Sequence, residues 1–215
     1  MAVAAIPCGE AERENRRRAV LKTAAEVFLE EGYAAASMSA IAARLGGSKS
    51  ALYNYFKSKD ELFAAVVGAR VNADQCIEAH QDLFSEKADL KTALFNFGRR
   101  IVWMFFDPTT LAFHRMLAAE AARFPAVGTL YYENVNLAHA RKLADFLQAQ
   151  VNLGTLCIDD VLLASFQFCE LSHAGFYLRS LWNISPKPSD AEIDSAITSA
   201  VLTFLIRYGA PGVAL

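Results

Sequence analysis

The sequence predicts an all-α protein, and three observations support this fold class. Apolar residues recur at the spacing of helix turns along most of the 215 residues, the alternation typical of strands is nearly absent, and Gly, Pro and Ser residues stand where helices would begin or end. Hydrophobic residues make up 54% of the chain, which is ample for a sizeable core. Charged residues make up 20% without long blocks of one sign, so a folded globular protein is expected.

The first predicted helix covers residues 13–31, and Gly32 follows it as a C-terminal stop. Its apolar face is formed by Val20, Ala24, Val27 and Phe28. Its N-terminal end is basic, through Arg13, Arg16, Arg17 and Arg18. Two interpretations of this arginine segment stay open: a solvated helix face, or contacts to phosphates that flank a DNA site.

Two short helices and one long helix follow the first. Ser37, Ser48 and Ser58 each precede an apolar-periodic segment, where a serine side chain can accept a hydrogen bond from a free amide of the first turn. The capped helices are predicted at residues 38–45, at 49–55 and from 59 into the seventies. Gly46 and Gly47 break the chain between the two short helices. This is the order of elements in a helix-turn-helix.

Five further helices are predicted downstream, which gives about nine in total. Pro108 and Gly154 end two of them and Pro125 opens one, while Ser189 and Glu192 form a capping box for the last. Their predicted ranges are 89–107, 110–124, 125–153, 159–182 and 190–208. We therefore expect an N-terminal three-helix helix-turn-helix domain over residues 10–58 and a C-terminal helical bundle over residues 59–215.

Charge is distributed unevenly between the two predicted domains. The net charge is −2, but residues 1–60 carry nine Lys and Arg against seven Asp and Glu, and the remainder carries 12 against 16. A polyanion would therefore meet the N-terminal quarter first. No window approaches about 18 uninterrupted apolar residues, so we expect no membrane span and a cytoplasmic protein.

The four cysteines predict neither a metal site nor a disulfide framework. Cys8, Cys76, Cys157 and Cys169 are scattered without CxxC spacing or a histidine at metal-ligand distance. We expect buried or idle thiols in a reducing compartment, and we predict no bound metal and no cofactor.

Residues 20–67 resemble the DNA-binding domain of the TetR/AcrR family almost throughout. The resemblance is carried by a first helix that ends in EEGY, by SMSAIAARLG, and by SKSALYNYFKSKDELF, which resembles the recognition helix of the family and its junction to the fourth helix. It implies a transcriptional regulator, not an enzyme, that binds palindromic operator double-stranded DNA as a dimer. Leu45, Gly46, Gly47 and Ser50 depart from the usual pattern of the family, so no relative's operator sequence is carried over.

The predicted recognition helix has the residues that its role requires. Small or polar side chains at its first turn can enter the major groove, while Leu52 and Phe56 suit a buried face. Phenolic hydroxyls and helix N-termini can contact phosphates at the groove margin. The predicted DNA-binding residues are Ser37, Ser48, Lys49, Ser50, Ala51, Tyr53, Asn54, Tyr55 and Lys59. The resemblance implies that Tyr53 and Lys59 hold phosphates and that Lys49, Ser50, Ala51 and Asn54 face bases.

Residues 112–156 resemble the AefR-like C-terminal domain found in some members of that family, through ArgPhePro, TyrTyr and a terminal glycine. Helices in this half are rich in aromatic residues, which form either a core or the wall of an apolar ligand pocket with a few polar groups. The predicted ligand-binding residues are Trp103, Phe106, His114, Tyr131, Asn134, Gln167, Glu170 and His173. We expect a small lipophilic or aromatic effector.

Glu170 and His173 lie three residues apart on an apolar helix and therefore on one face. This pair is compatible with a ligand site, a metal site, a catalytic pair, or a satisfied polar pair at an interface. Only two metal ligands are evident, and no nucleophile or oxyanion motif accompanies them. A structural polar pair is the favoured interpretation, and a helical enzyme is the least favoured.

The last two helices are predicted to form the homodimer interface. Their apolar faces comprise Leu163, Phe166, Glu170 and Phe176 on one helix and Ile193, Ile197, Val201, Phe204 and Tyr208 on the other. The resemblance to the family implies that these faces pack against the same faces of a second copy and form a four-helix interface. A dimer is also needed because two recognition helices about 34–36 Å apart read a palindrome, whereas one reads too few base pairs.

The sequence thus predicts a repressor that a small effector releases from DNA by a population shift. Activation stays open as the opposite sign of control. The alternative is a DNA-bound adaptor of the same fold, with a solid interior and a C-terminal surface that recruits a protein partner.

Overall fold

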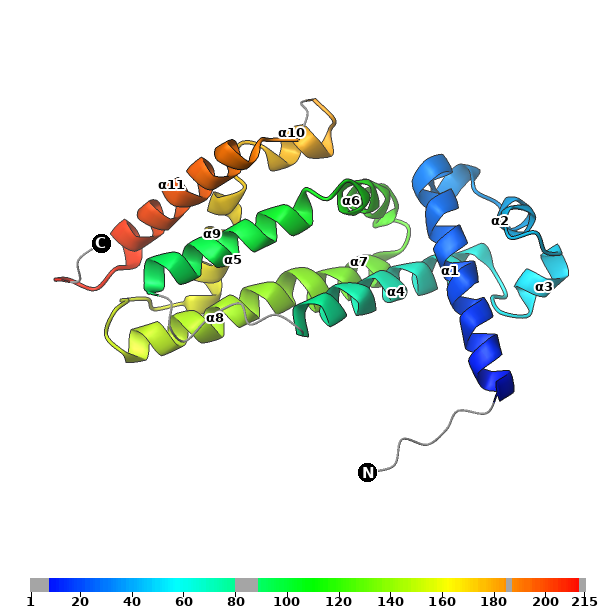
Figure 1. Cartoon of the computed structure of the whole chain (residues 1–215), viewed down its shortest axis with the longest axis horizontal. Helices are drawn as coiled ribbons and strands as arrows, with labels where there is room; N and C mark the ends of the chain where they lie inside the picture. The colour runs from blue at the N-terminus through cyan, green and yellow to red at the C-terminus, as the bar shows by residue number, and fades with distance from the viewer. Residues whose placement is uncertain (1–7, 80–88, 185–186, 213–215) are drawn as a thin grey trace. The chain divides into compact units, whose positions relative to one another are not determined.

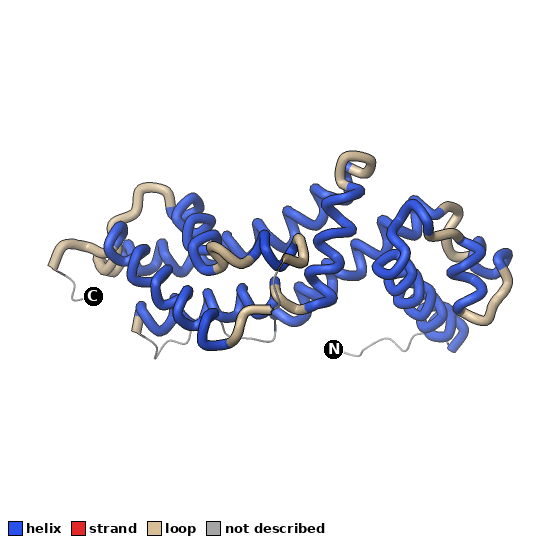
Figure 2. The backbone as a smooth tube through the Cα atoms, turned by 90° about the horizontal axis from the view of Figure 1, so that it is seen from above, coloured by secondary structure: helices blue, strands red, loops and turns tan. Residues whose placement is uncertain are grey.

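The computed structural model describes residues 8–79, 89–184 and 187–212. Within these ranges the regular structure is helical apart from one isolated bridge between Leu156 and Gly209, so the all-α prediction is confirmed (Figures 1 and 2). The helices are α1 (Cys8–Ala35), α2 (Met38–Arg44), α3 (Lys49–Tyr53), α4 (Lys59–Ala79), α5 (Leu90–Phe105), α6 (Pro108–Glu120), α7 (Pro125–Tyr131), the π-helical turn η1 (Tyr132–Asn136), α8 (Leu137–Asn152), α9 (Val161–Ser172), α10 (Tyr177–Leu181) and α11 (Asp190–Tyr208).

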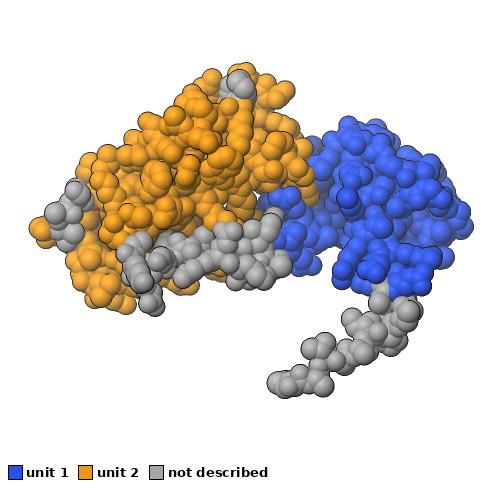
Figure 3. Space-filling model, in the orientation of Figure 1, with its two compact units in different colours: residues 1–74, 116–131 blue, residues 75–115, 132–215 orange. Residues whose placement is uncertain are grey.

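The chain divides into two compact units (Figure 3). Unit 1 comprises Met1–Asp74 and Met116–Tyr131, and unit 2 comprises Gln75–Arg115 and Tyr132–Leu215. The chain thus leaves unit 1 within α4 and returns to it for the end of α6 and for α7. The predicted boundary between residues 58 and 59 separates a DNA-binding domain from a ligand-binding and dimerisation domain. This division is one of function, and it stays a prediction.

Unit 1 has a core of α1, α2 and α4 side chains. The four apolar residues predicted for α1 are all buried, and so are Leu62, Phe63, Val66 and Val67 of α4. Phe63 lies at the centre of an aromatic cluster, because its ring centroid is 5.0–5.5 Å from those of Phe28, Tyr33 and Phe124. Phe124 belongs to the returning segment of unit 1.

Local turn chemistry fixes the ends of the first helices. The backbone of Gly32 leaves the helical region at φ 76°, as its predicted role as a stop requires, but one further helical turn extends α1 to Ala35. After α2, the amide of Gly46 donates to Ala43 and that of Gly47 to Ala42, which is the pair of bonds of a Schellman turn. The φ of Gly46 is 69°, a value that a glycine adopts without steric cost.

Unit 2 has its own core, formed by α5, α8, α9 and α11. Its buried members include Leu94, Phe97, Leu143, Phe168, Ile197 and Phe204. Gly98 permits the close approach of α5 to two other helices, because a Cβ atom there would lie 3.1 Å from both Ile197 and Ser172. Among the described residues, no helix has the length and apolar content that crossing a membrane requires.

Several predicted helices differ from the structure; α3 ends at Tyr53 rather than at residue 55, and α6 ends at Glu120 rather than at residue 124. The predicted helix 110–124 begins earlier, at Pro108, because the Asp107 carboxylate caps it by accepting from the amide of Thr110 at 3.0 Å. The predicted helix 125–153 contains the π-helical turn η1. The predicted helix 159–182 is interrupted after Ser172, where Gly175 has a φ of 89° before α10 begins.

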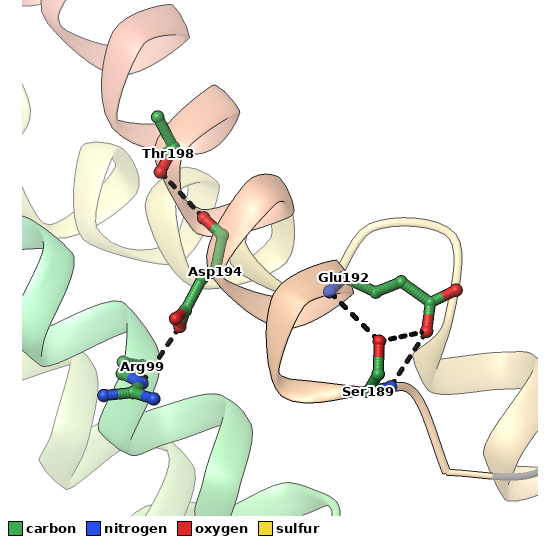
Figure 4. Close-up of polar contacts among 5 residues, drawn as sticks. All are labelled: Arg99, Ser189, Glu192, Asp194 and Thr198. Atoms are coloured by element: carbon green, nitrogen blue, oxygen red, sulfur yellow. Dashed lines mark hydrogen bonds and ion pairs between the residues drawn. The ribbon is translucent and has the colours of Figure 1, made fainter.

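The N-terminus of α11 is fixed by the capping box that the sequence predicts. The Ser189 hydroxyl oxygen accepts from the Glu192 amide, and the Glu192 carboxylate accepts from the Ser189 amide (Figure 4). One turn further, Asp194 forms an ion pair with Arg99 of α5 at 3.0 Å, without the alignment of a hydrogen bond. The Asp194–Arg99 ion pair thus links the first turns of α11 to α5.

Candidate functional site

The predicted recognition helix, α3, is short and capped by its own sequence. The Ser48 hydroxyl oxygen accepts from the Ala51 amide at 3.1 Å and lies 2.9 Å from the hydroxyl of Ser50. Leu52 and Phe56 are buried at 3% and 2% exposure, so one face of α3 is anchored in unit 1, as predicted. The opposite face is exposed.

That opposite face gathers most of the predicted DNA-binding residues on one surface. Tyr53 is 42% exposed, and the ammonium of Lys49 lies 5.9 Å from its ring centroid. Tyr55 is half-buried. The exposed members of the surface are Ser48, Lys49, Ser50, Ala51, Tyr53 and Asn54. Small and polar groups, one cation and one phenol are the chemistry that a major-groove helix needs.

Ser37 caps α2, where its hydroxyl oxygen accepts from the Ala40 amide at 3.1 Å. It is exposed, so the hydroxyl can still donate to an external acceptor. Ser58 caps α4 in the same way by accepting from the Glu61 amide at 3.0 Å. All three predicted serine caps of this segment are confirmed.

Lys59 serves the fold of unit 1 directly. Its ammonium donates to the carbonyls of Tyr33 at 2.7 Å and Ala36 at 2.8 Å, beyond the break at Gly32, and lies 4.3 Å from the Tyr33 ring centroid. These carbonyls end α1 without further helical partners, so the cation satisfies them. A phosphate contact from Lys59 would have to share this ammonium with the end of α1.

Tyr33 closes the same junction from the other side. Its ring is buried and its hydroxyl donates to the Asp60 carboxylate in the first turn of α4. Burial and this hydrogen bond raise the pKa of Tyr33 to about 12, so the phenol stays protonated. Lys59 and Tyr33 together fix α4 to the end of α1.

The arginine segment of α1 is used unequally. Arg16 pairs with Glu12 at 2.8 Å and Arg18 with Glu14 at 3.3 Å, both on the solvated surface. Arg17 instead lies 5.5 Å above the ring of Phe56, directly after α3. Arg17 is therefore placed beside the end of the predicted recognition helix.

In unit 2, two of the predicted ligand-binding residues line an open pocket of about 570 Å³. Glu170 and His173 are these two, and they approach each other to 3.9 Å between Nε2 and a carboxylate oxygen. The pocket is lined by Phe105, Asn136, Glu170, His173, Ala174, Gly175, Tyr177 and Leu178. We call it the α9–α10 pocket.

The walls of the α9–α10 pocket are aromatic. The ring centroid of Phe105 lies 5.8 Å from those of both His173 and Tyr177. The Tyr177 hydroxyl lies 3.1 Å from Nδ1 of His114, a predicted residue that thus orients a wall residue from behind. A flat aromatic molecule matches these walls.

Burial determines the protonation states of His173 and Tyr177 in the pocket. It lowers the pKa of His173 despite the opposing effect of Glu170, so the imidazole is neutral and can donate or accept a hydrogen bond. Burial, with a smaller contribution from Glu170, raises the pKa of Tyr177 and keeps its phenol protonated. Within the described residues no group of three possible metal-ligating side chains occurs.

The other predicted ligand residues lie elsewhere. Phe106 is buried in the core of unit 2, and Trp103 is 39% exposed beneath the ammonium of Lys187, 4.0 Å from its ring. Tyr131 is buried in unit 1, and Asn134 is half-buried in η1. Gln167 accepts from the Tyr208 hydroxyl at 2.5 Å and lines a second depression.

Sequence reasoning missed Phe105, Asn136 and Tyr177 as pocket residues. Phe105 and Tyr177 stand within the aromatic-rich segments, but helical spacing alone does not distinguish a wall from a core. Gly175 was the available signal, since a glycine before Tyr177 marks the break that turns α10 toward the pocket.

The second depression is an open groove of about 790 Å³, which we call the α9–α11 groove. Its lining residues are Leu163, Phe166, Gln167, Glu170, Leu171, Ala174, Thr203, Phe204, Arg207 and Tyr208. Leu202 and Ile206 add exposed apolar surface on α11, at 39% and 74% exposure. Exposed apolar surface of this extent is typical of a protein interface.

The predicted apolar face of α11 is wrong for three of its five residues, whereas Phe204 and Tyr208 line the groove. Ile193, Ile197 and Val201 are buried in the core of their own chain, where α5 and α9 cover them. The α9 part of the prediction agrees better, because Leu163, Phe166 and Glu170 line the groove, whereas Phe176 packs against Phe106. An apolar stripe on a helix does not reveal which neighbour covers it.

The described cysteine side chains are free thiols at Cys157, which is exposed, and Cys169, which is half-buried. Burial raises the pKa of Cys169 to about 12, so this thiol is not poised for reaction. The side chains of Cys8 and Cys76 lie outside the described residues.

Comparison with known proteins connects both sites to one family. Residues 20–66 match the model of bacterial regulatory proteins of the tetR family, and residues 92–210 match the C-terminal domain of AefR-like transcriptional repressors. The second match alone covers more than half of the chain.

Similar proteins support the same connection. The HTH-type transcriptional activator FasR of Mycolicibacterium smegmatis is 39% identical over 95 residues, 44% of this chain and 41% of FasR, so the match spans less than half of that relative. The Flavonoid-responsive Regulator FrrA is 32% identical, with 93% of this chain and 100% of FrrA covered and a TM-score of 0.77. A Mesorhizobium loti protein assigned to the TetR-family transcriptional regulators is 27% identical, with 92% and 98% covered and a TM-score of 0.82.

Proposed function

Because the chain belongs to the TetR family of bacterial transcriptional regulators, which are not enzymes, we propose that it is a repressor whose homodimer binds a palindromic operator and is released by a small aromatic effector. The exposed polar face of α3 over buried Leu52 and Phe56 is the observation that carries the DNA-binding part. Tyr53 holds a phosphate, while Lys49, Ser50, Ala51 and Asn54 face bases.

Lys59 contributes to DNA binding mainly by holding α4 to the end of α1. Its ammonium already donates hydrogen bonds to two carbonyls, so a phosphate would have to share this donor with them. The N-terminus of α4 still offers the partial positive charge of a helix start to the same phosphate.

The homodimer forms through α9 and α11. Support comes from the exposed apolar surface of the α9–α11 groove and from the need of a palindrome for two recognition helices. On α11, the exposed residues Leu202 and Ile206 contribute to this interface. Ile193, Ile197 and Val201, which the sequence predicted there, are buried in the core.

The effector is a small aromatic molecule held in the α9–α10 pocket. Phe105 and Tyr177 stack against its ring, and Glu170, His173 and Asn136 receive its polar substituents. Similarity to a regulator described as flavonoid-responsive favours a hydroxylated, flavonoid-like ligand. A pocket of about 570 Å³ also favours sensing over an adaptor with a solid interior.

DNA binding is tested by fluorescence anisotropy on the DNA upstream of the gene that encodes the protein, across a salt series. Wild type should bind with an affinity that falls steeply with salt, and a Lys49→Ala, Tyr53→Ala variant should lose binding while keeping its thermal stability. Arg141→Ala, which removes one exposed cation from α8, is the matched control and should bind like wild type. Equal binding by both variants would show that α3 is not the recognition helix.

Effector binding and the sign of control need separate measurements. Naringenin, a flavonoid, should bind wild type in calorimetry and should bind a Phe105→Ala, Tyr177→Ala variant at least tenfold more weakly. In a reporter assay, deletion of the gene should raise expression from its operator. A fall on deletion would establish activation, the role that the name of FasR records for that relative.

A further inference from the structure

The α9–α11 groove carries opposite charges at separated positions. Of the groove-lining residues, Glu170 is the one acid and Arg207 the one base. The Glu170 side chain is 77% exposed, and the Arg207 guanidinium lies 4.7 Å above the ring of Tyr208. An apolar groove with one charge of each sign can be complementary to a second copy of itself.

The two helices of the groove run antiparallel. Gln167 bonds to Tyr208 at 2.5 Å, and the rings of Phe168 and Phe204 lie 5.3 Å apart. Further along, Ser172 and Ile197 meet at the same point beside Gly98. Residue numbers therefore rise along α9 as they fall along α11.

This arrangement places the two charges on opposite sides of the Phe168 level. With a rise of about 1.5 Å per residue, Glu170 lies roughly 3 Å toward one end of the groove and Arg207 roughly 4.5 Å toward the other. A twofold axis perpendicular to the helices near this level exchanges the two ends. It brings Glu170 of one copy to the height of Arg207 of the other, and does so twice.

The same glutamate also belongs to the α9–α10 pocket. Glu170 and Ala174 line both the pocket and the groove, so the two depressions share a wall. On the pocket side, Leu178 is 53% exposed and Ala174 and Gly175 are exposed too. In a single protomer, the wall that the pocket shares with the groove is therefore exposed, and a molecule in the groove can cover it.

We infer that a second copy of this chain seats in the α9–α11 groove with Glu170 facing the partner subunit's Arg207, and that this contact completes the open wall of the α9–α10 pocket. The inference rests on the proposed function, which supplies the homodimer and the effector. Because the completed wall belongs to both sites, binding of the effector and dimerisation strengthen each other reciprocally.

Charge exchange tests the pairing. Glu170→Arg and Arg207→Glu should each weaken the dimer roughly tenfold or more in sedimentation equilibrium, because each places like charges together at two symmetric positions. The double variant that carries both changes restores opposite charges and should return to within a few-fold of wild type. Asp145→Arg and Arg141→Glu, exposed positions on α8, are the controls and should leave the dimer unchanged.

Amide hydrogen exchange tests the shared wall without any ligand. Residues 175–178 follow Ala174 in the chain but do not line the groove. Their amides should nevertheless exchange more slowly in the wild-type dimer than in either single variant at the same concentration. The double variant should recover this protection.

The outcomes separate this inference from the proposed function. A wild-type dimer that neither single change weakens, or a double variant no better than the singles, overturns the pairing alone. Equal exchange of residues 175–178 in dimer and monomer overturns the shared wall. A wild type that stays monomeric would overturn the homodimer of the proposed function, and this inference with it.

Discussion

The DNA-binding surface and the α9–α10 pocket are assembled from the chain in different ways. The exposed face of α3 comes from residues 48–54, next to one another in sequence, and rests on two buried anchors, Leu52 and Phe56. The pocket draws its walls from α5, from the η1–α8 junction, and from the break between α9 and α10. A surface made from one segment depends on local caps and a firm base, whereas a pocket made from several depends on how helices pack.

The largest expected effect is on the base of the DNA-binding surface. Phe63→Ala removes the centre of the aromatic cluster in unit 1 and should lower the free energy of unfolding by about 3–5 kcal/mol, from the lost burial and the cavity left behind. Urea denaturation measures this loss. Exposed Leu153→Ala, in unit 2, is the control and should change stability by less than about 0.5 kcal/mol. Equal effects would contradict the packing described for unit 1.

The second-largest expected effect is a loss of stability when volume is added to the core of unit 2. Gly98→Ala places a methyl group 3.1 Å from Ile197 and Ser172 and should cost about 1–3 kcal/mol, because both neighbours are buried. Thermal denaturation measures the change. Gly68→Ala in α4, where a Cβ meets nothing within 4 Å, is the matched control and should be neutral or stabilising. If both variants behave alike, α5 does not approach α9 and α11 as closely as described.

The cap of α3 permits stability and DNA binding to be separated. Ser48→Ala should cost about 0.5–2 kcal/mol of stability, because the Ala51 amide loses its acceptor. Ser48→Asp keeps an acceptor at that position but adds a negative charge to the exposed face, so it should retain stability and still weaken operator binding. Parallel melting curves and anisotropy titrations check both. Operator binding by Ser48→Asp at wild-type affinity would place the start of α3 away from DNA.

The smallest expected effect is the pH dependence of the pocket. Burial lowers the pKa of His173 below its ordinary value of 6.5, so the unfolded chain binds this proton more readily than the folded one. The contribution of His173 to stability is therefore full above pH 6.5 and declines as the pH falls below it. Unfolding curves between pH 5 and 8 should show a shallower decline in His173→Gln than in wild type. An identical decline would mean that His173 is not desolvated.

Much of the fold could be predicted from the sequence because its signals are local. Ser37, Ser48, Ser58 and the Ser189–Glu192 pair each cap the helix that they precede, and the spacing of Leu52 and Phe56 shows which face of α3 is buried. A cap or an amphipathic face depends on residues within about four positions, which the sequence displays directly.

The pocket could be predicted only in part, because its members meet through packing. Glu170 and His173 lie three residues apart at one helix end, so their proximity follows from their spacing, which favoured a structural polar pair. Phe105 and Asn136 reach the same place from other helices. Two aromatic residues illustrate the difficulty: Phe106 belongs to the core and Phe105 to the pocket wall, although they are adjacent in an aromatic-rich segment.

The all-α class, the order of the helix-turn-helix and the polar face of α3 could all be predicted from the sequence, because helix periodicity, caps and glycine turns act over one or two turns. The packing of the helices, in contrast, was needed to show that Ile193 and Ile197 face their own core, that Leu202 and Ile206 stay exposed, and that Lys59 ties α4 to the end of α1. These outcomes depend on which helices meet. An apolar or charged side chain becomes core, interface or internal tie according to the neighbour that covers it, and that neighbour lies far away in the sequence.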